Sequence, residues 1–99
     1  MARENKFQAN LIKEIEARFP GAIVMKNDAN YIQGIPDLTI LYKDKWATLE
    51  CKKSRNATHR YNQDDYVEMM NNMSFSAFIY PENKEEVLNE LQTALRVEK

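Results

Sequence analysis

The fold is decided by residues 36–52, which read PDLTILYKDKWATLECK. The segment reads as two strands around a tight turn, and the dipeptide Lys43-Asp44 supplies the two residues of that turn. We therefore predict a β-hairpin whose strands span residues 36–42 and 45–52. Because a two-residue turn sets the pairing of the flanking strands, it also sets which side chains face each other across the hairpin.

Two carboxylates face each other across this hairpin. Counting outward from the turn places Asp37 directly across from Glu50, with Cβ atoms about 4.5–5.5 Å apart. Facing like charges are destabilising unless something binds between them, and a divalent cation is the obvious ligand. Side chains alternate along a strand, so Lys52 shares the face of Glu50, whereas Cys51 points to the opposite face. The pattern predicts a hard-cation site with an ammonium group beside it, and a buried structural thiol behind it.

The same residues bear a family resemblance. The tetrapeptide GIPD at 34–37, followed by ECK at 50–52, resembles the motif of the PD-(D/E)xK nuclease superfamily. The Gly-x-Pro-Asp form, the short chain and Gln63 after the second motif are most similar to the compact phage-type and VRR-Nuc-like Holliday-junction resolvases. The resemblance covers residues 4–80. It implies a restriction-endonuclease-like domain that hydrolyses DNA with the help of Mg²⁺.

The resemblance also implies a role for each site residue. Asp37, Glu50 and the backbone carbonyl of Cys51 would bind the metal, and Lys52 would orient or deprotonate the attacking water and stabilise negative charge. Gln63, in the helix that follows, would hydrogen-bond the water or a phosphate oxygen. Mn²⁺ is expected to substitute for Mg²⁺, because oxygen ligands accept both ions.

The superfamily often adds a catalytic glutamate from the first helix, and this chain offers two. Residues 4–19 show helical spacing, with Phe7 and Leu11 on one apolar stripe. Glu4 continues that stripe toward the expected edge of the sheet, so it is the preferred catalytic glutamate. Glu14 shares an edge with the same stripe and is the alternative.

Positive charge is concentrated directly after the predicted site. The chain carries a net charge of −1, which by itself argues against a nucleic-acid binder, but the distribution of charge matters more than its sum. Five basic side chains lie within nine residues: Lys52, Lys53, Arg55, His59 and Arg60. We predict phosphate contacts by Lys26, Lys53 and Arg60. Gly34, which has no side chain, is predicted to let DNA approach the backbone closely.

The remaining periodicity predicts an α/β fold with the element order α-β-β-β-α-β-α. Outside the hairpin, the expected elements are a helix over 4–19, a strand over 22–25, a helix over 60–73, a strand over 75–80 and a last helix that begins at 81–83. The last strand follows a crossover helix and therefore needs a parallel partner. The result is a four-stranded mixed sheet flanked by helices.

Length and composition bound the class of protein. Ninety-nine residues suit one domain, so we expect residues 1–99 to form a single nuclease domain. One cysteine excludes an internal disulfide framework. The longest apolar runs are only a few residues, too short to cross a membrane. We expect a cytoplasmic protein of a bacterial or phage-infected cell, with no membrane association.

These observations predict a Mg²⁺-dependent endodeoxyribonuclease, structure-selective on branched DNA such as four-way junctions. A small domain with one active site would cut both strands of a junction as a symmetric homodimer. The alternative is a catalytically weak DNA-binding accessory module of phage or mobile-element recombination. The negative net charge and the undecided helix glutamate favour that alternative.

Overall fold

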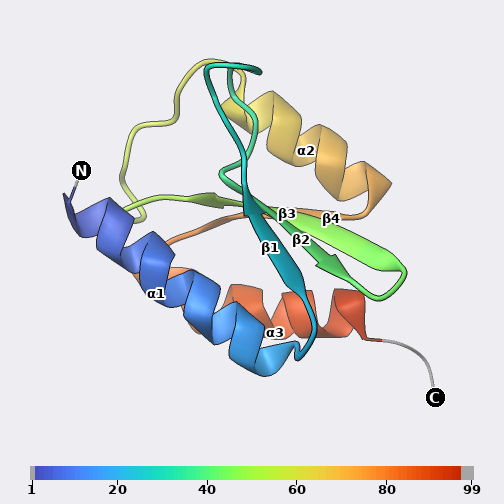
Figure 1. Ribbon diagram of the computed structural model, residues 1–99. Coiled ribbons are helices and arrows are strands. Elements are labelled where there is room, and N and C mark those ends of the chain that lie inside the picture. The colour runs from blue at the N-terminus through green and yellow to red at the C-terminus, as the bar shows by residue number, and fades with distance from the viewer. Residues whose placement is uncertain (1, 97–99) are drawn as a thin grey trace.

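A four-stranded mixed sheet forms the middle layer of the protein, with α2 on one face and α1 and α3 on the other (Figure 1). The computed structural model describes residues 2–96 and the side chains of residues 5–96. The elements are α1 (Ala2–Arg18), β1 (Ile23–Lys26), β2 (Leu38–Tyr42), β3 (Lys45–Cys51), α2 (Gln63–Met73), β4 (Phe75–Ile79), the 3₁₀ turn η1 (Pro81–Asn83) and α3 (Lys84–Leu95). The predicted α/β class and element order are confirmed. None of the helices within residues 2–96 is long and apolar enough to cross a membrane.

The strands lie in the order β1-β2-β3-β4. The first two pairings are antiparallel, and β3 pairs with β4 in parallel, as the crossover through α2 requires. In the β2–β3 hairpin, Tyr42 pairs with Lys45 and Leu38 pairs with Leu49. The predicted register is therefore correct, and its continuation by one residue places Asp37 opposite Glu50.

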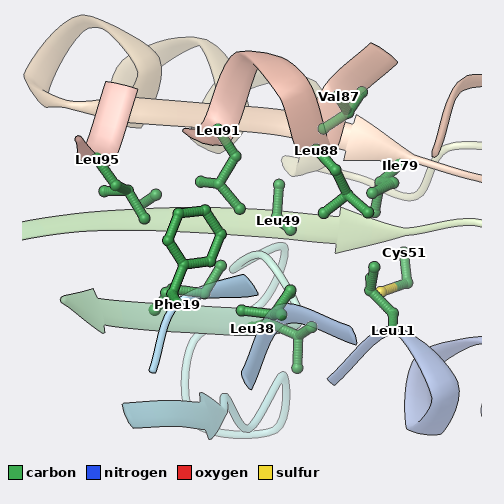
Figure 2. Close-up of a cluster of buried hydrophobic side chains, with 13 residues drawn as sticks. Leu11, Phe19, Leu38, Leu49, Cys51, Ile79, Val87, Leu88, Leu91 and Leu95 are labelled. Carbon is green, nitrogen blue, oxygen red and sulfur yellow. The ribbon is translucent and has the colours of Figure 1, made fainter. Parts of the chain in front are cut away.

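The apolar core lies between the sheet and the pair α1 and α3 (Figure 2). Every second residue of β2 and β3 points into it, which is the alternation expected of strands with one apolar face. Its buried members are Leu11, Ile15, Phe19, Leu38, Ile40, Ala47, Leu49, Cys51, Ile79, Val87, Leu88, Leu91 and Leu95. The Cys51 thiol is buried in this core, as predicted. The polar alternate residues of β3 consequently face α2.

Two element boundaries differ from those predicted, each for a local reason. α2 begins at Gln63 rather than at residue 60, because Asn62 has a left-handed backbone with φ 72° that a continuous helix excludes. β2 begins at Leu38 rather than at residue 36, since Pro36 has no N–H for the ladder. The other predicted ends agree with the observed ones to within two residues.

Gly34 brings together the two loops that flank the sheet end, residues 27–37 and 52–62. Its φ is +91°, and a Cβ atom built there would lie 2.5 Å from the Cβ of Asn62 and 2.9 Å from the carbonyl oxygen of Tyr61. The close approach that we predicted for DNA is thus made by the chain's own backbone. The DNA contact at Gly34 stays a prediction.

Replacement of Gly34 by alanine is expected to lower the free energy of unfolding by about 2–5 kcal/mol. The positive φ contributes about 1–2 kcal/mol and overpacking against Asn62 about 1–3 kcal/mol. Gly21→Ala is the matched control, because Gly21 has φ +92° but nothing within 4 Å of the added Cβ. It should lose only the backbone contribution. Urea denaturation of both variants measures the difference, and equal losses would contradict the close packing at Gly34.

Candidate active site

An open cleft with a volume of about 920 Å³ lies at the end of the sheet where β3 ends. Its walls are loop residues within 29–37 and 53–61, and its lining includes three buried polar side chains, Glu50, Lys52 and Gln63. The volume is within the range of about 300–1,000 Å³ typical of ligand sites. The structure thus brings together four of the five predicted catalytic residues in one cleft, with Asp37 on the wall.

The two predicted metal-binding carboxylates are held by backbone donors. The N–H of Asp37 donates to Oε1 of Glu50 over 3.2 Å. The N–H of Cys51 donates to Oδ2 of Asp37 over 2.9 Å. Each strand therefore donates to the carboxylate of the other strand. This exchange follows directly from the register of the hairpin, and it fixes both carboxylates side by side.

Gln63 connects the acid to the amine. Its Nε2 donates to Oε2 of Glu50 over 2.7 Å, and its Oε1 accepts from Nζ of Lys52 over 2.6 Å. The same Oε1 accepts from the N–H of Arg60 over 2.7 Å. Nζ of Lys52 also donates to the carbonyl of Thr58 over 3.0 Å and lies 3.7 Å from Oε2 of Glu50. The first residue of α2 thereby orients both charged groups.

The burial of this array has an energetic consequence. Glu50 is 2% exposed, Lys52 6% and Gln63 8%. Within the described residues, no buried side-chain nitrogen or oxygen lacks a hydrogen-bond partner. Even so, the desolvation of a buried ion pair offsets most or all of its attraction, and apolar residues of similar volume are often as stable or more so. Stability is therefore a weak reason for an ion pair at this position.

Asn27 holds the segment that carries Asp37, a role that the sequence analysis missed. Its Nδ2 donates to the carbonyl of Pro36 over 2.9 Å and to Oγ1 of Thr39 over 2.8 Å. Its backbone N–H donates to the carbonyl of Asp37 over 2.8 Å. An asparagine between two strands predicts only a turn, so no sequence signal identified this function.

His59 anchors the loop that carries the predicted phosphate contacts. Its ring stacks on Phe78 of β4 with 4.2 Å between the ring centroids. Its Nδ1 lies 2.6 Å from Oδ1 of Asp64. The loop is thus attached both to the sheet and to the first turn of α2.

The predicted DNA-contacting residues occupy two different places. Lys53 and Arg60 are exposed on the lining of the cleft, and Gly34 is buried in its wall. Lys26 is exposed at the end of β1 and lies outside the lining. The cations closest to the site are therefore those of the loop at 52–62.

Of the two candidate helix glutamates, only Glu14 has a side chain among the described residues. Oε1 of Glu14 accepts from Nζ of Lys84 over 3.0 Å, and Oε2 lies 3.6 Å from Nη2 of Arg18. Glu14 therefore joins α1 to α3 and does not line the cleft. The side chain of Glu4 lies outside the described residues, so its catalytic role stays a prediction.

The carboxylate oxygens at the cleft fit a magnesium ion that takes few of its ligands from the protein. Mg²⁺ takes one or two carboxylates and fills its other positions with water and substrate phosphate. Asp37 and Glu50 supply two carboxylates on one cleft. Among the side chains of residues 5–96, no group of three or more His, Cys, Asp or Glu residues forms a metal cluster. Coordination by the Cys51 carbonyl stays a prediction.

Comparison of the chain with protein-family models, with curated proteins and with solved structures gives no significant match. The geometry of the cleft and the motif in the sequence are therefore the basis on which a function can be assigned.

Lys52→Met is expected to lower the free energy of unfolding by about 3–5 kcal/mol, because it leaves the Glu50 carboxylate buried without its cation. The double variant Glu50→Gln, Lys52→Met should recover part of this loss, since neither charge is then buried. Lys45→Met is the control on the same strand. Nζ of Lys45 lies 3.8 Å from Oδ1 of the exposed Asp44, and such surface pairs contribute about 0–1 kcal/mol. Urea denaturation measures these three variants and Glu50→Gln alone, and a loss in the double variant equal to the sum of the two single losses would contradict coupling of the pair.

Proposed function

We propose that this protein is a metal-dependent endonuclease of the PD-(D/E)xK superfamily that hydrolyses DNA phosphodiester bonds. One observation carries the proposal: Glu50, Gln63 and Lys52 form a buried, hydrogen-bonded array beside Asp37 on an open cleft. Charged groups held out of water in a cleft are a feature of functional sites. The same four residues are those to which the motif resemblance assigns catalysis.

The carboxylates would hold the metal. Asp37 and Glu50 are oriented by the backbone donors of the opposite strand, so their positions are set before any ligand binds. A bound Mg²⁺ would lower the pKa of a coordinated water and neutralise charge on the phosphate. Pre-orientation of this kind is what makes electrostatic stabilisation effective, because little reorganisation is needed during the reaction.

Lys52 would act on the attacking water or on the phosphate. An ammonium group has three N–H donors, and bonds to Gln63 and Thr58 hold two of them. These bonds fix the position of Nζ in the lining of the cleft. From there Lys52 would orient the water that attacks phosphorus and stabilise the negative charge that develops on the phosphate oxygens. Gln63 would hold the Lys52 ammonium and the Glu50 carboxylate at fixed positions relative to each other.

The polarity of the cleft supports a nucleic-acid substrate. Lys53 and Arg60 are exposed on its lining and supply cations for backbone phosphates. Lys26 would extend this contact from the end of β1. The net charge of −1 does not oppose this placement, since local potential at a cleft guides a charged ligand.

Branched DNA and a symmetric homodimer complete the proposed function. Two copies would be needed to cut two strands at once, because each copy would supply one active site. Exposed apolar side chains support a dimer: Ile23 and Met25 of β1, Leu41 of β2, and Met69 and Met73 of α2. A four-way junction is the substrate that the resemblance implies.

The alternative function is a DNA-binding accessory module with weak or no catalysis. The observation in its favour is that only two carboxylates among the described side chains meet at the cleft. It predicts binding to branched DNA without metal-dependent cleavage.

Replacement of Lys52 by methionine is expected to reduce the rate of DNA cleavage by about 10²–10⁴-fold, the contribution typical of a positioned proton donor or acceptor. Asp37→Asn should reduce it at least as much. Labelled four-way junction, linear duplex and single strand are each incubated with Mg²⁺, with Mn²⁺ and with EDTA. Lys45→Met and Asp44→Asn, made in the same hairpin but outside the cleft, should cleave like the wild type. Full cleavage by both site variants would refute the assigned site.

Metal binding should separate the roles of the two residues. Asp37→Asn is expected to abolish binding of Mn²⁺ measured by calorimetry, because it removes a charged oxygen ligand. Lys52→Met should retain binding, since the ammonium is not a ligand. The reverse pattern would show that the metal, if bound, lies elsewhere than between the two carboxylates.

A further inference from the structure

Two tyrosines, one on the lining of the cleft and one in a loop that forms its wall, are exposed to an unusual degree. Tyr61 lines the cleft with 74% of its surface exposed. Tyr31 is 84% exposed and lies in the neighbouring loop, in which Asn30 and Gln33 line the same cleft. These two are the most exposed large apolar side chains among the described residues. Figure 1 shows their loops at the same end of the molecule.

The backbone beneath both rings is held in place. The Tyr61 carbonyl packs against Gly34, so the two loops are in direct contact. The N–H of Tyr31 donates to the carbonyl of Asp28 over 3.0 Å, and Oδ1 of Asp28 accepts from the N–H of Asn30 over 2.8 Å. Since a tyrosine has only two side-chain torsions, a partner that covers these rings orders few degrees of freedom.

The cationic and aromatic side chains on the lining of the cleft indicate the kind of partner that it would bind. Lys53 and Arg60 lie on the same lining as Tyr61. Cations next to exposed aromatic rings match the alternation of phosphates and bases in a single strand, where the rings stack on bases and the cations contact the backbone. In a duplex the faces of the bases are covered by their neighbours, so an aromatic platform has nothing to stack on unless a nucleotide is unpaired or flipped out.

We infer that the cleft is selective for DNA with unpaired nucleotides next to the bond it cleaves, and that Tyr61, assisted by Tyr31, stacks on those bases. The inference rests on the proposed nuclease function and deepens it. A gap or a flap presents such nucleotides, and an open branch point exposes the faces of its innermost bases, whereas a continuous duplex does neither. Base stacking is tolerant of sequence, so the selectivity is for structure alone.

The test is the ratio of affinities for two DNA molecules of equal length, one with a single-stranded flap and one fully paired. Binding is measured by fluorescence anisotropy in EDTA, which prevents cleavage. Tyr61→Ala should reduce the flap-to-duplex ratio by about 5- to 150-fold, the range for loss of one aromatic stack. Tyr61→Phe should keep the ratio within about twofold, because the ring remains. Tyr31→Ala should reduce it by a smaller factor.

The control on the protein is Gln92→Ala, which removes an exposed side chain of α3 outside the cleft and should leave the ratio unchanged. The control on the DNA replaces the unpaired nucleotides of the flap with abasic residues, which keep the phosphates. With this flap, wild type and Tyr61→Ala should bind equally. A ratio that is near one in the wild type, or one that Tyr61→Ala leaves unchanged, would overturn the inference.

Cleavage distinguishes this inference from the function on which it rests. Lys52-dependent cleavage with no flap preference would overturn the stacking role and leave the nuclease intact. Tyr61-dependent flap binding without metal-dependent cleavage of any DNA would support stacking and refute the nuclease.

Discussion

The register between β2 and β3 is the constraint on which the core and the cleft both depend. It pairs Leu38 with Leu49 on the face that α1 and α3 cover. One residue further toward the end of the sheet, the N–H of Asp37 donates to the Glu50 carboxylate and the N–H of Cys51 donates to the Asp37 carboxylate. A slip of one residue would exchange the two faces of β3. Glu50 would then enter the apolar core, and Leu49 would enter the cleft. The packing energy of the core therefore also holds the positions of Asp37 and Glu50 at the cleft.

The second constraint is the parallel pairing of β3 with β4. Parallel neighbours need a crossover, and the core face is already covered by α1 and α3, so α2 lies on the polar face. This path places Gln63 between Glu50 and Lys52. It also makes the loop at 52–62 a wall of the cleft. The topology thus assembles an acid, an amide and an amine from segments that are separated along the chain.

Features set by local periodicity were predictable, and features set by contact between distant loops were not. The alternation of side chains and the short turn at Lys43 were sufficient for the hairpin, its register and the buried position of Cys51. The start of α2 depends on Asn62, whose left-handed backbone reflects its packing against Gly34. The burial of Gln63 cannot be deduced from helical spacing, because the loop that precedes α2 determines how its first turn packs against the sheet. Only the motif resemblance singled out Gln63.

Hydrogen bonds between polar groups on distant elements could not be predicted from the sequence either. Glu14 lies at an edge of the apolar stripe of α1, yet it pairs with Lys84, which is 70 residues away in the chain. The amide of Asn27 satisfies two acceptors beside Asp37 that no sequence rule connects with it. Such bonds depend on the final separation of elements, whereas sequence periodicity reports only which face of an element is apolar.

The two faces of the sheet differ in how much apolar surface they bury. The core face buries thirteen apolar side chains, while α2 buries only Val67 and Gln63 against the other face. Beneath α2, the buried side chains of Thr48 and Ser76 are polar, and Oγ1 of Thr48 donates to Oγ of Ser76. Regions with few buried apolar contacts open locally at lower free energy than a core. The cleft therefore lies on the layer that can adjust to a ligand, while the register that positions its carboxylates is held by the layer that cannot.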